Sequence, residues 1–425
     1  MDFYPTIYFV FPYRGVGGVP VLFFRVATYL KQHNLAHPIL VDYADGAMSV
    51  LARAADSEIT VVVYPERGRL VIPGNSFAVF QSMTPWSMFS NLRLHKDTRV
   101  LFWTCHPYNL VLPIPGFRFF GYRFKRLSGF MRRTILAAWF TKLKRFIEKI
   151  AENRGLVFMD HENRRNTEEQ NGIVLENPDY LPIPIGTAEI ISRPSLRDEK
   201  QRLRITWIGR LVDFKYYPLR RLLISMEQYA QKQMVDFQCT IIGDGPYLRT
   251  LRKLANDLSR VDVVFHGDVG LSDLRVLIDY KTDIVAAMGT SALEGAARAV
   301  PTILLDLSYK EIPENYRFKW LYEASGYNLA EQVTEEHLIS ETNSFSKLLL
   351  EYAKDSSSVG ESCSAYVKSY HSLDIVSHQL LRYLNLSQLT AKDIQNLTGT
   401  GDRSFTRRVY LLFRTLRERM KQKNG

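Results

Sequence analysis

Short apolar runs alternate along the chain with longer stretches in which apolar residues recur at helical spacing. The first run, 7–11, is followed by a glycine-rich turn at 14–18 and by helical spacing over 21–30. This order predicts a strand, a tight turn and a helix. Further apolar runs that predict strands lie at 39–41, 59–63, 100–103 and 156–159. Strands separated by helical or irregular segments are typical of a parallel sheet with crossover connections.

A second series of the same kind begins after a proline-rich stretch at 177–184 and a polar segment at 192–202. We expect the linker between two domains there. The predicted strands of this series lie at 204–208, 237–242, 261–265, 284–287 and 302–305. The predicted helices lie between them, at 219–232, 247–258, 271–280 and 291–299. The regular alternation predicts a second α/β domain with a parallel sheet.

The length of the chain supports this division, because 425 residues exceed the size at which a single hydrophobic core usually stops growing. We expect an α/β fold with two Rossmann-like domains, at 1–190 and 191–365. A helix at 366–386 is expected to pack back toward the first domain, and 387–425 to form a basic amphipathic tail. With 46% hydrophobic and 23% charged residues, the composition is that of a folded globular protein.

The cysteines, the N-terminal sequence and the lengths of the apolar runs indicate the cellular compartment of the protein. Cys105, Cys239 and Cys363 are too few and too scattered for a disulfide framework or a CxxC metal site, which favours a reducing environment. The N-terminus lacks the basic region and cleavage site of a signal peptide. No run approaches the roughly 18 apolar residues that a spanning helix needs. We therefore expect a cytoplasmic protein whose contact with a membrane is peripheral, at its inner face.

The net charge of +11 is concentrated in two segments. Ten basic residues and one acidic residue lie between 118 and 149, and nine basic and three acidic residues lie between 385 and 425. Because apolar residues recur at helical spacing in both, we expect contact with an anionic membrane through 118–150 and 403–423. An ordinary core helix is the alternative for the first segment. Without a recognised nucleic-acid-binding motif, we expect no nucleic-acid partner.

Loops that directly follow the strands of a parallel sheet are where its ligands bind. After 204–208 comes a loop with Arg210 and Lys215, a guanidinium and an ammonium that together suit a diphosphate. A solvated basic turn is the alternative. The next two loops carry Gly243, Gly245 and Gly267, where backbone could approach a nucleotide base, although a plain turn would use the same residues.

The fourth loop, with Gly289, Thr290 and Ser291, opens a predicted helix whose free N–H groups could bind phosphate. Glu294, one turn into that helix, could accept hydrogen bonds from the hydroxyls of a ribose. Ser291 and Glu294 also have the spacing of a capping box, which is the structural alternative.

The order and spacing of GRL-x3-K, IIGDGP, F-x-G and GTSALEGAARAVP resemble the donor half of glycosyltransferase family 4, also called glycosyl transferases group 1. These are retaining enzymes of the GT-B fold, in which two Rossmann-like domains face each other across a cleft. The resemblance is strong over 205–306 and weaker across the first half. It implies that Arg210, Lys215 and the backbone of 289–291 bind the donor diphosphate, and that Glu294 binds the ribose.

In the first half, the resemblance rests on Gly17 and Gly18, which match the family's Gly-Gly loop. It implies that they bring a helix N-terminus toward the donor diphosphate. His106, directly after 100–103, stands at about the position of a cleft histidine that contacts the donor sugar in related enzymes. We take His106 as the candidate catalytic residue, with a structural or surface role as the alternative.

The resemblance implies an enzyme that moves a sugar from a nucleotide diphosphate sugar to a glycan or lipid-linked acceptor, with retention. The pathway it implies is cell-envelope polysaccharide or lipopolysaccharide biosynthesis. The first domain would be on the acceptor side, and the second would bind the nucleotide sugar. We expect no cofactor and no metal, because zinc-ligand spacing and a DxD motif are absent from the sequence. Cationic side chains and helix N-termini would then stabilise the leaving nucleoside diphosphate.

One departure from the family pattern keeps alternatives open. The family typically has a carboxylate eight residues before the position of Glu294, where this chain has Ala286. The first alternative is a catalytically silent GT-B protein that binds a nucleotide or acts as a scaffold at the membrane. The second, an NAD-dependent dehydrogenase, is disfavoured because Pro20 stands where the GxGxxG motif has its third glycine.

Overall fold

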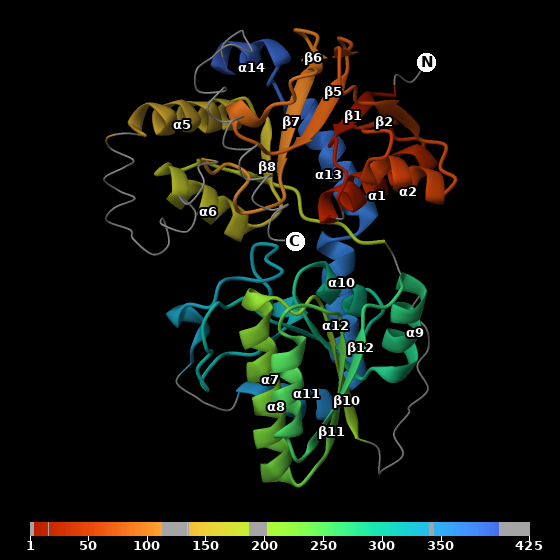
Figure 1. Ribbon diagram of the computed structural model, residues 1–425, viewed down its shortest axis with the longest axis vertical. Helices are drawn as coiled ribbons and strands as arrows, with labels where there is room; N and C mark the ends of the chain where they lie inside the picture. The colour runs from red at the N-terminus through yellow and green to blue at the C-terminus, as the bar shows by residue number, and fades with distance from the viewer. Residues whose placement is uncertain are drawn as a thin grey trace. The chain divides into compact units, whose positions relative to one another are not determined.

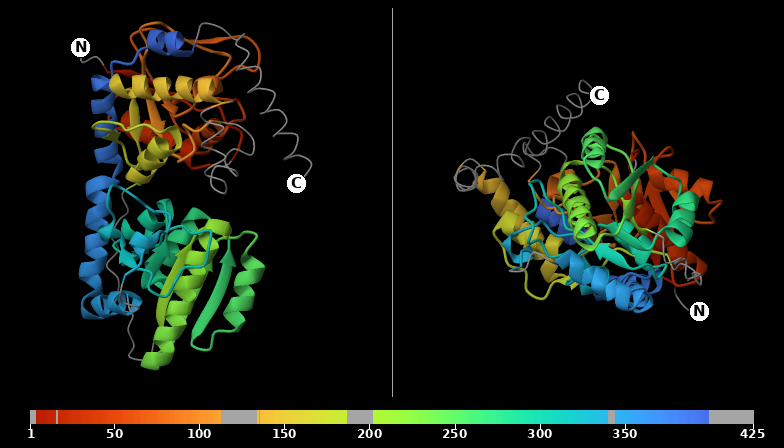
Figure 2. Two further views of the ribbon diagram at one scale, coloured as in Figure 1. Left: turned by 90° about the vertical axis from the view of Figure 1, so that its left-hand side faces the viewer. Right: turned by 90° about the horizontal axis from the view of Figure 1, so that it is seen from below.

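The computed structural model describes residues 4–15, 17–112, 134, 136–186, 202–339 and 344–398 of the chain. The chain forms two compact units (Figures 1 and 2). Unit 1 comprises Met1–Ile183 and Val376–Gly425, and unit 2 comprises Pro184–Ile375. The division between them therefore lies at the end of the proline-rich stretch 177–184.

Unit 1 is built on a seven-stranded parallel sheet with the strand order β3-β2-β1-β5-β7-β8-β9. Its strands are β1 (Thr6–Val10), β2 (His37–Asp42), β3 (Thr60–Val63), β5 (Phe77–Gln81), β7 (Arg99–Thr104), β8 (Leu156–Phe158) and β9 (Asp179–Tyr180). A separate two-stranded parallel sheet pairs β4 (Leu70–Ile72) with β6 (Leu92–Leu94). The central strands β1, β5 and β7 are largely buried, as expected for a parallel sheet that helices cover on both faces.

Helices of unit 1 pack on both faces of this sheet. They are α1 (Gly18–Gln32), α2 (Ala47–Ala54), α5 (Ala137–Glu152), α6 (His161–Asn171), the larger part of α13 (Leu373–Leu386) and α14 (Ala391–Thr398), with a short 3-10 turn at Pro85–Ser87. Side chains alternate along a strand, so neighbouring residues of β7 contact helices on opposite faces of the sheet. Phe102 packs against Phe146 of α5, with 5.8 Å between ring centroids, whereas Trp103 stacks on Phe23 of α1 at 6.1 Å.

Two features of unit 1 differ from the sequence-based expectation. The central strand β5 lies within a region expected to be helical or irregular, and it pairs with both β1 and β7. Residues 387–398 were expected to belong to a basic tail, but they are part of the core, where Leu389 and Ile394 are buried. Backbone pairing explains this, since the N–H of Val100 donates to the carbonyl oxygen of Leu389 at 2.9 Å.

Unit 2 contains a six-stranded sheet with the order β12-β11-β10-β13-β14-β15, parallel except for β15 at one edge. Its strands are β10 (Leu203–Ile208), β11 (Phe237–Ile242), β12 (Val261–Gly267), β13 (Ile284–Ala287), β14 (Thr302–Leu304) and β15 (Lys319–Trp320). Its helices are α7 (Asp213–Gln233), α8 (Leu248–Asn256), α9 (Leu271–Lys281), α10 (Thr290–Ala296), α11 (Ser344–Lys354) and α12 (Ser356–Tyr370), with 3-10 turns at Leu321–Glu323 and Glu335–His337. The predicted alternation of strands and helices is confirmed here.

α7 begins six residues earlier than expected, with Pro218 inside the helix. A proline in a helix interior removes a backbone donor and normally breaks the helix. Here Pro218 and Leu219 are buried, together with Leu222 and Leu223 of the next turn. Burial of this apolar face against the sheet outweighs the local preference of proline.

α5 contains the described part of the first basic segment. Leu143, Phe146, Ile147 and Ile150 of this helix are buried in the core of unit 1, whereas Lys144, Arg145 and Lys149 are exposed. The alternative of an ordinary core helix is therefore right for α5, and its apolar face is not available to a membrane. Residues 118–133, 135 and 403–423 lie outside the described part of the chain. Among the described helices, none is long and apolar enough to cross a membrane.

Candidate functional site

Loops after β10, β11 and β12 form one connected surface at the carboxyl edge of the unit 2 sheet. The N–H of Gly209 donates to the carbonyl oxygen of Ile242 at 2.9 Å, and the N–H of Gly243 donates to that of Gly267 at 2.7 Å. These bonds run from loop to loop across three neighbouring strands. Such an edge of backbone and short loops is where parallel sheets bind their ligands.

Close packing of these loops explains two of the predicted glycines. A Cβ atom at position 243 would lie 2.2 Å from the carbonyl oxygen of Gly209, and one at position 245 would lie 2.4 Å from that of Leu211. Gly243 and Gly245 also have φ angles of +129° and +154°, which other residues adopt only with strain. The turn interpretation thus accounts for both residues, and contact of Gly243, Gly245 or Gly267 with a nucleotide base stays a prediction.

Two cations lie together where β10 ends and α7 begins. Arg210 is exposed, and Lys215 is half-buried in the first turn of the helix. Burial, together with the nearby charge of Arg210, lowers the pKa of Lys215 to about 8. The Nζ atom of Lys215 lies against the backbone of Gly209, only 2.9 Å from where a Cβ atom of that residue would be.

Neither cation has a carboxylate within ion-pair distance in the part of the chain that the structure describes. A half-buried ammonium next to a second positive charge is unfavourable unless an anion compensates both. The arrangement therefore suits an anionic ligand such as a diphosphate, to which a guanidinium and an ammonium both donate strong hydrogen bonds.

α10 begins on the same edge, directly after β13, the strand that pairs with β10. Its N-cap is Gly289, without a side-chain hydrogen bond to cap the helix, and Thr290 is its first residue. Ser291 is therefore the second helical residue and not the cap, so the capping-box alternative is wrong. Glu294 is half-buried one turn further along. The backbone N–H groups of Thr290 and Ser291 lie in the first turn, where helices bind anions.

Ala286, which stands where the family pattern has a carboxylate, lies within β13 and is fully buried. Its register partners are Trp207 of β10 and Ile303 of β14, both core residues. A carboxylate at this position would lie in the hydrophobic core and not at the ligand edge, which is strongly unfavourable. Position 286 therefore offers no side chain to a ligand at this edge.

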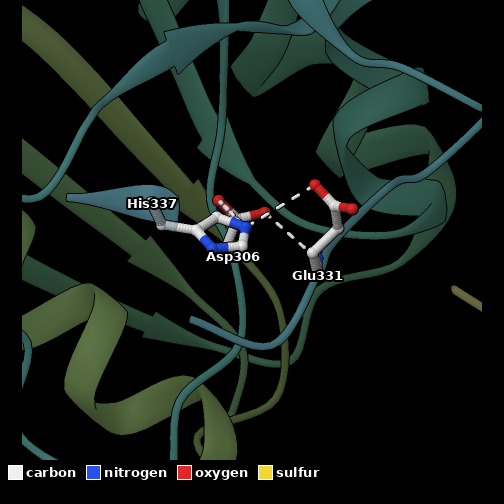
Figure 3. Close-up of side chains that lie close together, drawn as sticks. All are labelled: Asp306, Glu331 and His337. Carbon is white, nitrogen blue, oxygen red and sulfur yellow. Dashed lines mark hydrogen bonds and ion pairs between the residues drawn. The ribbon is translucent and has the colours of Figure 1, made fainter. Parts of the chain in front are cut away.

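A cluster of charged side chains that includes Asp306, Glu331 and His337 (Figure 3) lies beside the loop that is hydrogen-bonded to the N-cap of α10. Asp306 follows β14 and is fully buried, and the Nζ of Lys319 lies 3.3 Å from its Oδ1 and 3.5 Å from Oε2 of Glu331. The hydroxyl of Tyr316 donates to Oδ2 of Asp306 at 3.0 Å. The ring of His337 points toward the two carboxyl groups, with Nε2 3.6 Å from Oε2 of Glu331.

This cluster positions the backbone that holds the start of α10. The N–H of Glu331 donates to Oδ1 of Asp306 at 3.0 Å. Two residues before Glu331, the carbonyl oxygen of Leu329 accepts from the N–H of Gly289 at 2.7 Å. Asp306 and Glu331 therefore fix the loop against which the first residues of α10 are placed.

In the described part of the chain, Asp306, Glu331 and His337 are also the group whose ligand atoms could surround a metal ion, all within 4.8 Å of one another. The ammonium of Lys319 already contacts both carboxylates. It supplies the positive charge that a metal would bring. We assign the cluster a structural role.

In unit 1, the loop after β1 carries Gly17, the N-cap of α1, and Gly18, its first residue. The buried carboxylate of Asp42 holds this loop, because the N–H of Tyr13 donates to its Oδ1 at 2.8 Å and the N–H of Met48 donates to its Oδ2 at 2.7 Å. Burial raises the pKa of Asp42, and its backbone hydrogen bonds oppose that shift.

His106 is exposed on the loop after β7. Its Nδ1 accepts a hydrogen bond from the N–H of Tyr108 at 3.2 Å, which orients the ring. Because β1 and β7 are both parallel to β5 between them, His106, Gly17 and Gly18 lie at the same edge of the unit 1 sheet. The structure thus gathers the predicted residues into two sets, one in each unit.

Sequence reasoning missed Asp42, Asp306, Lys319 and Glu331. The two aspartates end or directly follow strands β2 and β14, so inspection of strand ends could have found them. Lys319 and Glu331 lie far from Asp306 along the chain and at no regular spacing. Only folding brings them together.

Residues 202–335 match the family model described as glycosyl transferases group 1. In a comparison with curated proteins, none matches the sequence of this chain. A glycosyltransferase from Rickettsia africae has a similar structure, at 13% identity and a TM-score of 0.53, covering 94% of this chain and 100% of that one. The N-terminal domain of trehalose-6-phosphate phosphatase from Candida albicans is similar at 13% identity and a TM-score of 0.52, covering 91% of this chain and 97% of that one. These likenesses show a shared GT-B fold, as expected.

Proposed function

We propose that this glycosyltransferase, whose residues 202–335 form a glycosyl transferases group 1 domain, transfers a sugar from a nucleotide diphosphate sugar to a glycan or lipid-linked acceptor. The observation that carries the proposal is the pair Arg210 and Lys215. Lys215 is half-buried beside a second cation and has no carboxylate partner among the described residues. A donor diphosphate would supply the missing negative charge.

In the proposed reaction, the bond between the anomeric carbon and the diphosphate breaks while the acceptor hydroxyl attacks that carbon. Negative charge then develops on the departing nucleoside diphosphate. Arg210, Lys215 and the N–H groups of 289–291 would stabilise this charge, which lowers the barrier because it develops mainly in the transition state. Glu294 would accept hydrogen bonds from the ribose, and Gly17 and Gly18 would bring a second helix N-terminus to the diphosphate.

His106 would contact the donor sugar from unit 1. It is exposed after the end of β7, and its Nδ1 accepts a hydrogen bond from the N–H of Tyr108. Retention of anomeric configuration is part of the proposal and rests on the family resemblance. Proton transfer from the acceptor to the leaving phosphate would complete the reaction without a metal or cofactor.

We place the reaction at the inner face of a membrane, in the assembly of a cell-envelope polysaccharide or lipopolysaccharide. The support is the basic charge in 118–149 and toward the C-terminus, together with the exposed side chains of Lys144, Arg145 and Lys149 on α5. Anionic headgroups attract such charge by about 1 kcal/mol per residue near the surface. Electrostatic attraction of this kind does not require the apolar face of α5.

A thermal-shift screen against UDP, GDP, ADP and NAD tests the donor site. A ligand that binds the folded protein raises its melting temperature. We expect one nucleoside diphosphate to stabilise the wild type but not Arg210→Ala or Lys215→Ala. Lys253→Ala, an exposed lysine on α8, is the matched control and should keep the full shift.

A measurement of turnover distinguishes an active glycosyltransferase from a catalytically silent protein that only binds the nucleotide. With the stabilising nucleotide identified, the corresponding sugar nucleotides are incubated with the wild type, Glu294→Ala and His106→Ala, and released nucleoside diphosphate is measured. We expect release by the wild type and a loss of at least about tenfold in each variant. Stabilisation by NAD alone would contradict the proposal, and binding without any turnover would favour the silent alternative.

A further inference from the structure

A polar cavity lies in unit 2, between α7, the segment 314–318 and the first turn of α11. Its volume is about 290 Å³, and its lining includes Arg221 and Lys232 of α7 and Ser346 of α11. Along α7, Arg221 is six residues beyond Lys215, which corresponds to about 9 Å of helix. The cavity is therefore distinct from the proposed donor site at the carboxyl edge of the unit 2 sheet.

Arg221 is a buried cation whose hydrogen-bond partners are both neutral, with the carboxylates of Glu314 and Glu311 acting on it only at longer range. Its side chain is 7% exposed, and it donates through Nε to Oγ of Ser225 at 3.1 Å and through Nη2 to Oε1 of Gln228 at 2.8 Å. In the described part of the chain, no residue accepts from Nη1 and no carboxylate forms an ion pair with this guanidinium. Burial lowers the pKa of Arg221. A guanidinium in such surroundings favours an anionic partner.

The first turn of α11 adds further donors. This helix runs for 11 residues from Ser344 and has no acidic residue in its first turn, so its dipole favours negative charge at this end. The hydroxyl of Ser346 has no partner among the described residues. The Ser344 hydroxyl, in contrast, is engaged with the backbone of Tyr316 and Phe318.

The charges of the lining residues and the volume of the cavity indicate which class of ligand it can bind. Lys232 is an exposed cation of the lining, and Glu314 is the exposed acid opposite, where it accepts from Nε2 of Gln228 at 3.1 Å. The two cations exceed the single acid. A volume of about 290 Å³ is at the lower limit for small-molecule pockets, so it suits a small anion better than a nucleotide.

We propose that this cavity binds the phosphoryl group of a small metabolite, either inorganic phosphate or a sugar phosphate. Arg221, Lys232 and the first residues of α11 all line it. A phosphoryl group accepts several charge-assisted hydrogen bonds at once. This matches the side-chain donors of the lining, namely Nη1 of Arg221, the ammonium of Lys232 and the Ser346 hydroxyl.

The experiment is a titration of the full chain with inorganic phosphate, followed by calorimetry and by the melting temperature. The test variants are Arg221→Gln, which removes the buried charge, and Ser346→Asp. The aspartate suits a helix N-terminus, so the fold should be retained, but its charge repels phosphate. We expect both to weaken phosphate binding by at least about tenfold. Arg220→Gln, an adjacent arginine paired with Glu311, is the matched control.

Lys215→Ala weakens anion binding at the proposed donor site, and the phosphate binding that remains should still depend on Arg221 and Ser346. A parallel titration with glucose 6-phosphate distinguishes the two sources: tighter binding than phosphate assigns a sugar phosphate, and equal or weaker binding assigns the free ion. The proposal is overturned if the wild type shows no saturable binding, if Ser346→Asp binds phosphate normally, or if Lys215→Ala abolishes binding.

Discussion

Gly243 donates its backbone N–H to the carbonyl oxygen of Gly267 at 2.7 Å, which joins the loops after β11 and β12. The same glycine packs so closely on Gly209 that a Cβ atom would lie 2.2 Å from its carbonyl oxygen. Three loops at the carboxyl edge of the unit 2 sheet therefore depend on one residue without a side chain.

We expect Gly243→Ala to destabilise the protein by about 2 kcal/mol or more, because the new methyl group meets backbone that cannot move and the φ angle becomes strained. Urea unfolding measures the change. Gly186→Ala, where the added carbon meets open space and φ is not positive, should change stability by less than about 0.5 kcal/mol. Equal stability of the two variants would contradict the packing argument.

The lowered pKa of Lys215 predicts how nucleotide affinity depends on pH. The pKa is about 8 in the ligand-free folded protein and about 10.4 in an unfolded chain. Between these two pH values the unfolded chain binds more protons than the folded protein. Burial of the charged lysine therefore lowers the free energy of unfolding fully below pH 8, and this loss of stability disappears as the pH rises toward about 10.4. A bound diphosphate needs the charged form. We therefore expect its affinity to fall above pH 8, by up to about tenfold per pH unit.

Calorimetric titrations with the nucleoside diphosphate from pH 7 to 9.5 measure this dependence. Lys215→Arg keeps its charge throughout this range and should show a much flatter profile. If the wild type and this variant have the same slope, the ionisation of Lys215 is not coupled to binding.

Lys319 is expected to be required for stability and for nucleotide binding. Lys319→Met leaves the buried carboxylate of Asp306 next to Glu331 without the ammonium that contacts both. We expect a loss of roughly 3 kcal/mol in the free energy of unfolding. Affinity for the nucleotide should also fall, because the loop that holds Gly289 loses its support.

Urea unfolding and nucleotide titration check both effects. Lys310→Met replaces an exposed lysine in the neighbouring segment and should leave both quantities nearly unchanged. If Lys319→Met lost stability but bound nucleotide like the wild type, the cluster would be structural without positioning the start of α10.

The basic face of α5 is expected to bind anionic lipid. Lys144, Arg145 and Lys149 are exposed, and the contacts of the two lysines with Glu148 and Glu152 are surface ion pairs of little energetic weight. Replacing all three by glutamine should weaken binding to phosphatidylglycerol vesicles by roughly a hundredfold at low salt, at about 1 kcal/mol per residue.

Vesicle co-sedimentation measures this change. The same substitution of Arg249, Lys253 and Lys281, exposed basic residues of unit 2, removes an equal charge elsewhere and should have a much smaller effect. Equal losses in the two triple variants would show that only net charge matters, and unchanged binding in the α5 variant would exclude this helix from the membrane contact.

Much of the fold of unit 2 follows from its sequence. The predicted strands from 204–208 to 302–305 lie within two residues of the observed ones, because short apolar runs separated by amphipathic helices leave few other arrangements. Unit 1 was less predictable. β5 has no glycine or proline directly at its ends and is apolar on both faces. The periodicity of its apolar residues therefore could not distinguish a strand from a buried helical segment.

The sequence by itself determined which loops carry chemistry, since strand–loop–helix order places Arg210, Lys215 and the residues from Gly289 to Glu294 at one sheet edge. Tertiary structure alone decided the environments of these residues. It showed that Lys215 is half-buried with no acidic partner among the described residues, that Ala286 lies in the core, and that Asp306, Lys319 and Glu331 contact one another at the loop that holds the start of α10. The reason is physical: sequence spacing sets position along an element, whereas burial and ionisation depend on neighbours that only folding brings together.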